Sequence, residues 1–178
     1  ILSPISDNPD YPNYRLNSNK SQNYDSSLIK DVKEIDGYSM IINKKFFINN
    51  IFFDEKFFMY LENVDLCLRA KKDSGKLLII MNSKIHHLGA QAVDDKYFEE
   101  VELSRNWHWT WSKFYFNKKH RGFFVSTLLG FISLLGNFLK YIIYMITFNK
   151  KRNIYRMRMS GIINSLLGRQ SWYRPEIN

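Results

Sequence analysis

Apolar and polar positions change their pattern several times along the chain. Residues 1–30 are rich in Ser, Asn, Asp, Tyr and Pro without a sustained hydrophobic period, which predicts a loop with one short strand at its start. Two short apolar runs, 38–42 and 77–81, predict buried strands. An aromatic stretch between them, 46–60, is broken by turn residues and predicts irregular structure. The first part of the chain is therefore expected to contain a sheet.

A first helix is predicted from Asn63 to Lys72. Asn63 is a favoured N-cap, and Asp65 lies in the first turn, where the helix dipole favours a negative charge. Cys67 falls on the apolar side of this helix, so we expect it to pack in the core. Gly75 follows the last turn and is the expected C-cap. Strands and a helix together predict an α/β fold.

A second, longer helix is predicted from Asp94 or Asp95, either of which can cap it, to about Asn117. It carries three tryptophans, of which the first and third share one face: Trp107, Trp109 and Trp111. Such residues can stack on a sugar ring or a lipid carrier. We expect them instead to anchor at a membrane interface or to pack against the main body of the protein's first part.

The stretch 122–148 is mainly apolar and carries no charge except that of Lys140, and basic clusters flank both of its ends. It is long enough to cross a bilayer, but Gly136, Asn137 and Lys140 would then lie near the bilayer centre. The basic flanks on both sides give no preferred direction of crossing. Two short helices, 123–135 and 138–148, that lie in one leaflet fit this pattern better. A true span and a buried soluble hairpin remain alternatives.

The formal net charge of +9 is concentrated in the second half of the chain. Between Glu102 and Glu176 there is no Asp or Glu, whereas Lys and Arg recur there. This half is expected to face an anionic partner, and its pairing with the apolar stretch favours an anionic membrane surface. Nucleic acid is disfavoured, because the basic residues bracket an apolar stretch and do not line a polar stripe. The only cysteine, Cys67, suits a cytoplasmic location.

The most informative string is FDEKFFMYLENVDLCLR, residues 53–69. It holds four carboxylates beside aromatic side chains and at a predicted helix start: Asp54, Glu55, Glu62 and Asp65. A carboxylate at a helix N-terminus stays ionised and can accept a proton near neutral pH. The alternative is that Glu62 and Asp65 only cap the helix.

This string resembles a signature of family 2 glycosyltransferases, particularly the rhamnosyltransferase-like enzymes of bacterial surface polysaccharide assembly. Three neighbouring segments resemble further parts of that family in the same order, namely 37–43, 83–89 and 161–169. The resemblance covers about Asp36 to Arg169. It implies an α/β, GT-A-like nucleotide-diphospho-sugar transferase domain, present in part, with a C-terminal helical membrane-associating appendage. The expected division is 1–120 for the transferase part and 121–178 for the appendage.

The resemblance also implies a reaction and roles for individual residues. A sugar, with rhamnose one candidate, would pass with inversion from a nucleotide-sugar donor to a lipid-linked or glycan acceptor, with Mg²⁺ or Mn²⁺ on the departing diphosphate. The catalytic candidates are Glu62, Asn63 and Asp65. His87 is implied as a metal ligand. The residues implied to bind substrate are Gly37, Asp54, Glu55, Tyr60 and Arg69.

Two departures from the family pattern limit this expectation. Asn63 stands where the family has its aspartate base, and an amide cannot accept a proton at neutral pH. Glu62 or Asp65 would then act in its place. The opening residues carry no Asp-x-Asp motif, so we expect the acceptor side without the nucleotide-binding half that holds most of the cation. The expected location is peripheral or monotopic at the cytoplasmic face of the cell membrane. The alternative is a catalytically inactive membrane-associated remnant or interaction module.

Overall fold

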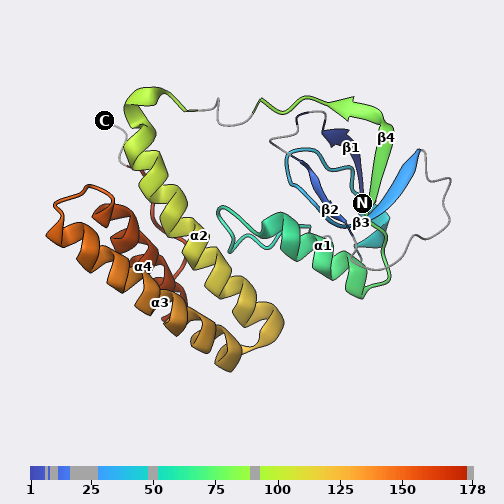
Figure 1. Ribbon diagram of the computed structural model, residues 1–178. Coiled ribbons are helices and arrows are strands. Elements are labelled where there is room, and N and C mark those ends of the chain that lie inside the picture. The colour runs from blue at the N-terminus through green and yellow to red at the C-terminus, as the bar shows by residue number, and fades with distance from the viewer. Residues whose placement is uncertain (7, 9–11, 17–27, 48–51, 89–92, 176–178) are drawn as a thin grey trace. The chain divides into compact units, whose positions relative to one another are not determined.

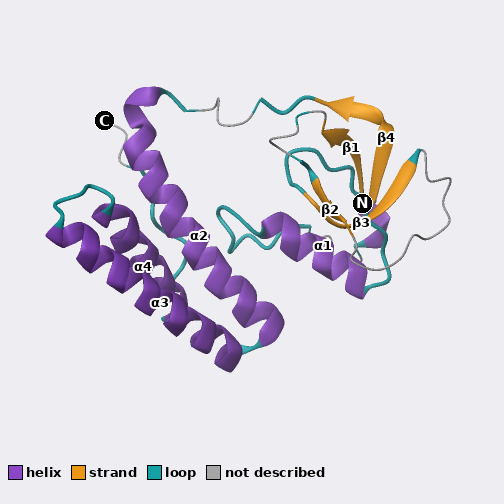
Figure 2. Ribbon diagram, viewed as in Figure 1, coloured by secondary structure: helices purple, strands orange, loops and turns teal. Residues whose placement is uncertain are grey.

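A computed structural model describes the chain except for residues 7, 9–11, 17–27, 48–51, 89–92 and 176–178. It is a mixed α/β structure with a four-stranded sheet and a long C-terminal helical region (Figures 1 and 2), which confirms the predicted class. The chain forms two compact units. Unit 1 comprises Ile1–Asp54 and Glu62–Ala92, and unit 2 comprises Glu55–Leu61 and Val93–Asn178. The GT-A-like assignment stays a prediction.

Unit 1 is a mixed sheet with one helix packed on it. The strand order is β1-β4-β3-β2, with β1 and β4 parallel and the other neighbours antiparallel. The elements are β1 Leu2–Ser6, β2 Tyr14–Leu16, β3 Ile29–Ile35, the short η1 Lys44–Phe46, α1 Glu62–Lys72 and β4 Leu78–Ile85. Contacts between α1 and β3 close a core that includes Val32, Ile35, Leu66, Cys67, Ala70, Leu77 and Ile79. The prediction that Cys67 packs in the core is confirmed, since 1% of it is exposed.

The strands differ from the prediction in one place. The apolar run 38–42 is not a strand; within it only Ile41 forms an isolated bridge, to Leu2. The strand is β3, whose Val32 and Ile35 are buried between charged neighbours. Those charges hid the strand from a search for apolar runs. The run 77–81 is confirmed as the start of β4, and two short strands, β1 and β2, occupy the region for which one was predicted.

The ends of α1 are built differently from the expectation. The helix begins at Glu62, so the prediction that Asn63 is its N-cap is wrong; the Asn63 amide donates to the Ile35 carbonyl at 3.0 Å. At the other end Ser74, with φ 63°, takes the left-handed position expected of Gly75. The Gly75 N–H then donates to the Ala70 carbonyl at 2.8 Å, as in a Schellman motif.

Unit 2 is built mainly from three helices that pack against one another (Figure 1). After the short η2 Asp95–Tyr97 come α2 Phe98–Arg121, α3 Phe123–Ile146 and α4 Arg152–Leu166. The Asp94 side chain accepts from the Lys96 N–H and so caps the short η2. The prediction that Asp94 or Asp95 caps the long helix is wrong, because the N-cap of α2 is Tyr97, which makes no side-chain cap hydrogen bond. Gly122, with φ 87°, separates α2 from α3. The predicted boundary after residue 120 falls in the last turn of α2, inside unit 2.

The prediction of two short helices in 123–148 is wrong, because α3 is one continuous helix of 24 residues. Asn137 does not break it, since its Nδ2 donates to the Ser133 carbonyl at 2.7 Å within the helix. Gly136 is tolerated in the helix, and a Cβ added to it would meet nothing within 4 Å. A Gly-Asn pair is therefore not enough to interrupt this apolar helix.

Two glycines let the helices of unit 2 approach closely. A Cβ on Gly130 of α3 would lie 2.8 Å from the ring of Phe114 on α2. A Cβ on Gly161 of α4 would lie 2.4 Å from both the Trp107 carbonyl oxygen and Thr110 Oγ1. Thr110 Oγ1 in turn donates to the Arg158 carbonyl of α4 at 2.9 Å. The contact between α2 and α4 thus depends on a position without a side chain.

We expect Gly161→Ala to destabilise unit 2 and Gly136→Ala not to. The added methyl at 161 must displace backbone, which typically costs about 1–3 kcal/mol. At 136 it meets open space and improves helix propensity by roughly 0.5–1 kcal/mol. Urea unfolding of the full chain, followed by circular dichroism in mild detergent, measures both. Equal effects of the two substitutions would contradict the packing described.

Candidate functional site

The first turn of α1 lies against the segment that follows β3. A Cβ on Gly37 would lie 3.4 Å from Asn63 Cβ and 3.8 Å from Glu62 Oε1. Asn63 Nδ2 donates to the Ile35 carbonyl at 3.0 Å and to Asp36 Oδ1 at 3.3 Å. Three of the predicted site residues, Gly37, Glu62 and Asn63, therefore come together in unit 1.

Glu62 has a carboxylate oxygen that the fold does not use. Its Oε2 is buried and has no hydrogen-bond partner among the described residues. Buried polar atoms are nearly always paired, so an unpaired carboxylate oxygen is an unusual feature. The two residues before it, Tyr60 and Leu61, have φ values of 70° and 67°. Non-glycine residues in this left-handed region are uncommon and cluster at functional sites. Glu62 is thus placed to accept a hydrogen bond or a proton.

Asp65 and Arg69 form a structural pair. Asp65 is fully buried, and its Oδ2 accepts from Arg69 Nε at 2.8 Å. Arg69 Nη2 also donates to the carbonyl of Phe52, so the guanidinium joins α1 to the loop before it. The Asp65 carboxylate is therefore already engaged by Arg69 of the same helix. Of the two predicted proton acceptors, the geometry favours Glu62.

His87 lies against the same segment as Glu62. Its ring stacks on Tyr38, the neighbour of Gly37, with ring centroids 4.1 Å apart and an interplanar angle of 14°. Its carbonyl accepts from Asn8 Nδ2 at 2.9 Å. Within the described part of the chain, no three His, Cys, Asp or Glu side chains are grouped so that they could hold a metal ion. The role of His87 as a metal ligand therefore stays a prediction.

Asp36 is a candidate that the sequence pattern missed. Burial raises the pKa of its carboxyl above the usual range, and this is partly offset by Arg15, by the Asn63 amide and by His87. A raised pKa brings a carboxylate closer to the working range of a general base. Asp36 precedes a glycine at the end of a strand, and that position was the one signal that could have drawn attention to it. Asn63, which cannot be a base, supplies a donor to this second carboxylate.

The remaining predicted residues are divided between the units. Asp54 belongs to unit 1, whereas Glu55 and Tyr60 belong to unit 2. Glu55 lines a cavity of about 490 Å³, and the Tyr60 ring packs edge-on against Trp109 with centroids 5.5 Å apart. The other two tryptophans, Trp107 and Trp111, are buried. Their indole N–H groups donate to Ser160 of α4 and to the Arg169 carbonyl, so these bonds hold them against the C-terminal region and not against the predicted transferase part.

His108 of α2 is a buried histidine that the sequence pattern did not single out. Its Nε2 is 2.7 Å from the Tyr173 carbonyl, and its Nδ1 is 2.9 Å from Ser171 Oγ. Burial lowers the pKa of the imidazole, the Tyr173 carbonyl opposes this, and the charge of Arg174 adds to the lowering. The neutral ring therefore donates to the carbonyl and accepts from the serine. It ties the C-terminal segment to α2.

We expect unit 2 to lose stability as the pH falls below about 6.5, the ordinary pKa of histidine. Because the pKa of His108 is lower in the folded state, the unfolded chain binds the proton first, so stability is full above that pH and declines until the folded pKa is passed. His108→Gln removes this dependence, and His120→Gln on the same helix retains it. Urea unfolding between pH 5 and 8 measures both. A pH profile that His108→Gln leaves unchanged would refute the assignment.

Comparisons with protein-family models, with curated proteins and with solved structures found no match for this chain. A function is therefore inferred from its own residues and their geometry. The features that bear on it are the unpaired Glu62 oxygen, the Asp36–Asn63 contact and the Tyr38–His87 stack. All three lie in unit 1, around the segment 36–38.

Proposed function

We propose that this chain is the acceptor side of an inverting glycosyltransferase that works at the cytoplasmic face of a membrane. The donor would be a nucleotide sugar, with rhamnose one candidate sugar, and the acceptor a lipid-linked or other glycan. The observation that carries the proposal is the buried, unpaired Oε2 of Glu62 at the start of α1, inside the string 53–69. The competing proposal, an inactive remnant or interaction module, is favoured by Asn63 in the position of the expected base.

In the proposed reaction Glu62 accepts the proton of the acceptor hydroxyl as that oxygen attacks the anomeric carbon of the donor. The bond from this carbon to the diphosphate breaks, and the nucleoside diphosphate leaves with the bonding electrons. Gly37 leaves room beside the carboxylate, and the Asp65–Arg69 pair fixes the helix that carries it. The described residues contain no group of three side chains that could hold a metal ion. The resemblance assigns the cation mainly to a nucleotide-binding half.

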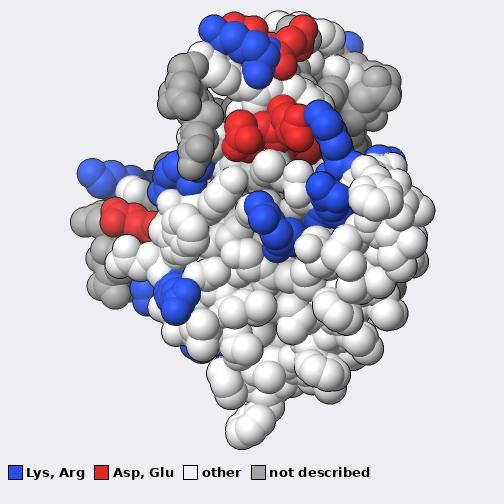
Figure 3. Space-filling view, turned by 90° about the vertical axis from the view of Figure 1, so that its left-hand side faces the viewer, with Lys and Arg blue, Asp and Glu red and all other residues white. Residues whose placement is uncertain are grey.

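The polarity of α3 supports attachment to a membrane. The residues of α3 that are buried are small or polar, namely Ser126, Gly130 and Asn137. Its large apolar side chains are exposed instead: Phe123, Phe124, Val125, Leu128, Leu129, Phe131, Ile132, Leu135, Phe138, Leu139, Ile143, Met145 and Ile146. Figure 3 shows a broad area of surface without charged side chains on the side of unit 2 where α3 lies. An exposed apolar face of this extent favours a lipid environment.

The packing of α4 on α3 favours a helix that lies along the membrane surface. By length and composition alone α3 could cross a bilayer, which is weak support for a membrane location. However, α4 contacts α3 near both ends, at Gly130 through Ile162 and at Tyr144, which stacks on Tyr155 with centroids 5.3 Å apart. Since α4 also carries Arg152, Arg156 and Arg158, a crossing would bring these charges into the hydrocarbon. Placement in one leaflet avoids that cost.

We expect Glu62→Gln to lower sugar transfer by roughly 10²–10⁴-fold, the usual contribution of a general base. The assay measures radiolabelled sugar transfer to a lipid-linked acceptor, on the chain alone and on the chain preceded by a family 2 nucleotide-binding half. Asp36→Asn tests the second carboxylate, and Glu99→Gln, an exposed residue of α2, is the control. Transfer by Glu62→Gln at the rate of the unsubstituted chain would remove Glu62 from this role. No transfer or donor hydrolysis with the added half would favour the inactive remnant.

We expect the chain to sediment with vesicles that contain anionic lipid, through the exposed face of α3. The double substitution Leu128→Glu and Ile132→Glu removes two apolar side chains from that face and should weaken binding at least tenfold, because burying each contributes about 1.5–3 kcal/mol. Leu88→Glu changes a similarly exposed residue of unit 1 and is the matched control. Equal sedimentation of the double variant and the unsubstituted chain would contradict the proposed attachment.

A further inference from the structure

We propose that the cavity of unit 2 binds a ligand that bears a phosphate or diphosphate group. The cavity has a volume of about 490 Å³, enough for a diphosphate with part of an organic substituent. It is lined by the loop 55–58, by α2, and by the end of α4 with the segment that follows it. All of these residues belong to unit 2, so the proposal does not depend on glycosyl transfer in unit 1.

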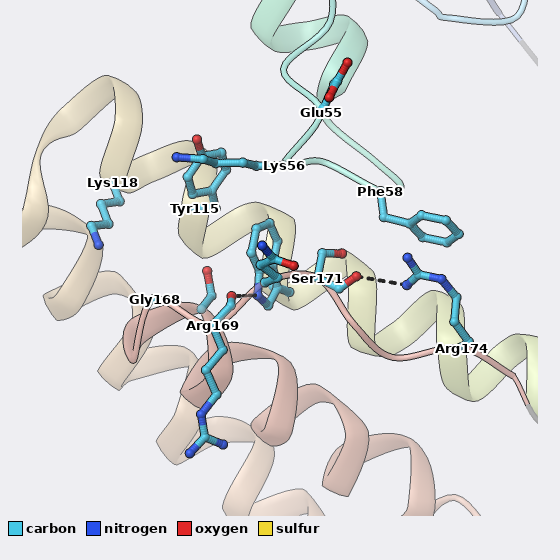
Figure 4. A pocket seen from close by; sticks show the side chains of 12 residues that line it. Glu55, Lys56, Phe58, Tyr115, Lys118, Gly168, Arg169, Ser171 and Arg174 are labelled. Atoms are coloured by element: carbon cyan, nitrogen blue, oxygen red, sulfur yellow. Dashed lines mark hydrogen bonds between the residues drawn. The ribbon is translucent and has the colours of Figure 1, made fainter.

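The charges around the cavity favour an anion. Its lining contains four cationic side chains, Lys56, Lys118, Arg169 and Arg174, but one carboxylate, that of Glu55. Among the described residues, Lys118 and Arg174 form no ion pair with a carboxylate. Arg169 points its guanidinium away from Ser171 in Figure 4, so we assign Lys118 and Arg174 to the ligand. A bound anion would relieve the repulsion among these cations.

Ser165 supplies a second and independent indication of a ligand. It is 3% exposed and lines the cavity, yet its hydroxyl has no hydrogen-bond partner among the described residues. The last carbonyls of α4 are already bonded, since Gly168 N–H donates to the Ser165 carbonyl at 3.1 Å and Arg169 N–H to that of Asn164 at 3.0 Å. They are therefore not left to repel an anion. The Ser165 hydroxyl is a donor that a phosphate oxygen can satisfy.

Aromatic side chains form part of the cavity wall. Trp111 is buried, donates from Nε1 to the Arg169 carbonyl at 3.1 Å, and stacks on Tyr115 with centroids 5.2 Å apart. At the opposite side of Figure 4, the Arg174 guanidinium lies 3.4 Å from the centroid of the Phe58 ring. Arg174 Nη1 donates to the Ser171 carbonyl at 2.9 Å, which leaves its other nitrogens for the ligand. The rings also offer an apolar surface to the organic part of the ligand.

A phosphate group fits this lining better than a carboxylate or a neutral glycan. It carries close to two negative charges and three acceptor oxygens, which match several cations and a hydroxyl. A carboxylate brings one charge, and a neutral glycan brings none. The organic substituent could be a nucleoside or a prenyl chain, because either can lie on an aromatic wall. These two sources share the diphosphate chemistry and can be separated by experiment.

Isothermal titration calorimetry of the full chain with three probes tests the proposal: inorganic diphosphate, uridine diphosphate and geranyl diphosphate. We expect saturable binding that weakens as salt is raised. Lys118→Gln and Arg174→Gln should each weaken it about tenfold, and Ser165→Ala about threefold or more, in line with the loss of charged and neutral hydrogen bonds. Lys113→Gln changes an exposed lysine of the same helix as Lys118 and should bind normally.

Tighter binding of geranyl diphosphate than of the other probes would identify a lipid-linked ligand, and tighter binding of uridine diphosphate a nucleotide; either supports the proposal. Absence of saturable binding for all three probes would overturn it. So would equal binding by Lys118→Gln and Lys113→Gln. Lys118 is a suitable test because it lines the cavity and is not one of the buried residues of α2. The measurement needs no catalysis, so a failure of sugar transfer leaves its outcome unaffected.

Discussion

The arrangement of unit 2 depends on which side of α3 is packed. Ser126, Gly130 and Asn137 face the neighbouring helices, and the Gly130 position lets α3 approach the Phe114 ring on α2. Small residues at such a contact are typical of helices that associate in a membrane, because there the apolar side chains gain nothing by turning inward. The ammonium of the exposed Lys140 lies 5.7 Å from the ring centroid of Tyr155 on α4. The large apolar side chains of α3 are exposed, which inverts the usual arrangement of a soluble helix. The proposed membrane attachment follows from this inverted orientation.

Unit 1 uses its polar residues in two different ways. Asp65 and Arg69 form an ion pair within α1, which stabilises that helix in the fold. Among the described residues, neither Glu62 nor Asp36 has such an ion pair. Glu62 has a buried oxygen without a hydrogen-bond partner among those residues, so the fold leaves its hydrogen-bonding capacity unused. Burial raises the pKa of Asp36, and a carboxyl with a raised pKa is a candidate for chemistry. The proposed transfer reaction uses this difference, with Asn63 as a donor to Asp36 and Glu62 as the base.

Sequence patterns predicted the helical elements better than the contacts between distant residues. The long helix that follows Asp94 and the core position of Cys67 are local features, and both are confirmed. Strand β3 was missed because charged residues alternate with its buried Val32 and Ile35. The site at Asp36 was missed because its partner Asn63 lies 27 residues away, a contact that no local pattern carries. The helix break expected at Asn137 is absent because of a local contact: the Asn137 side-chain amide donates to the Ser133 carbonyl of the preceding turn.

The most direct test of the inverted orientation of α3 is the depth of spin labels along its exposed face. Labels are attached to cysteines at positions 124, 128, 135 and 139 in a Cys67→Ser background, with the chain bound to anionic vesicles. Their relative accessibility to oxygen and to a water-soluble nickel chelate gives the depth of each. The account predicts that all four lie at a similar shallow depth, about 5–10 Å below the headgroups. A depth that reaches the bilayer centre near 135 and decreases on both sides, or free access of nickel at every position, would contradict it.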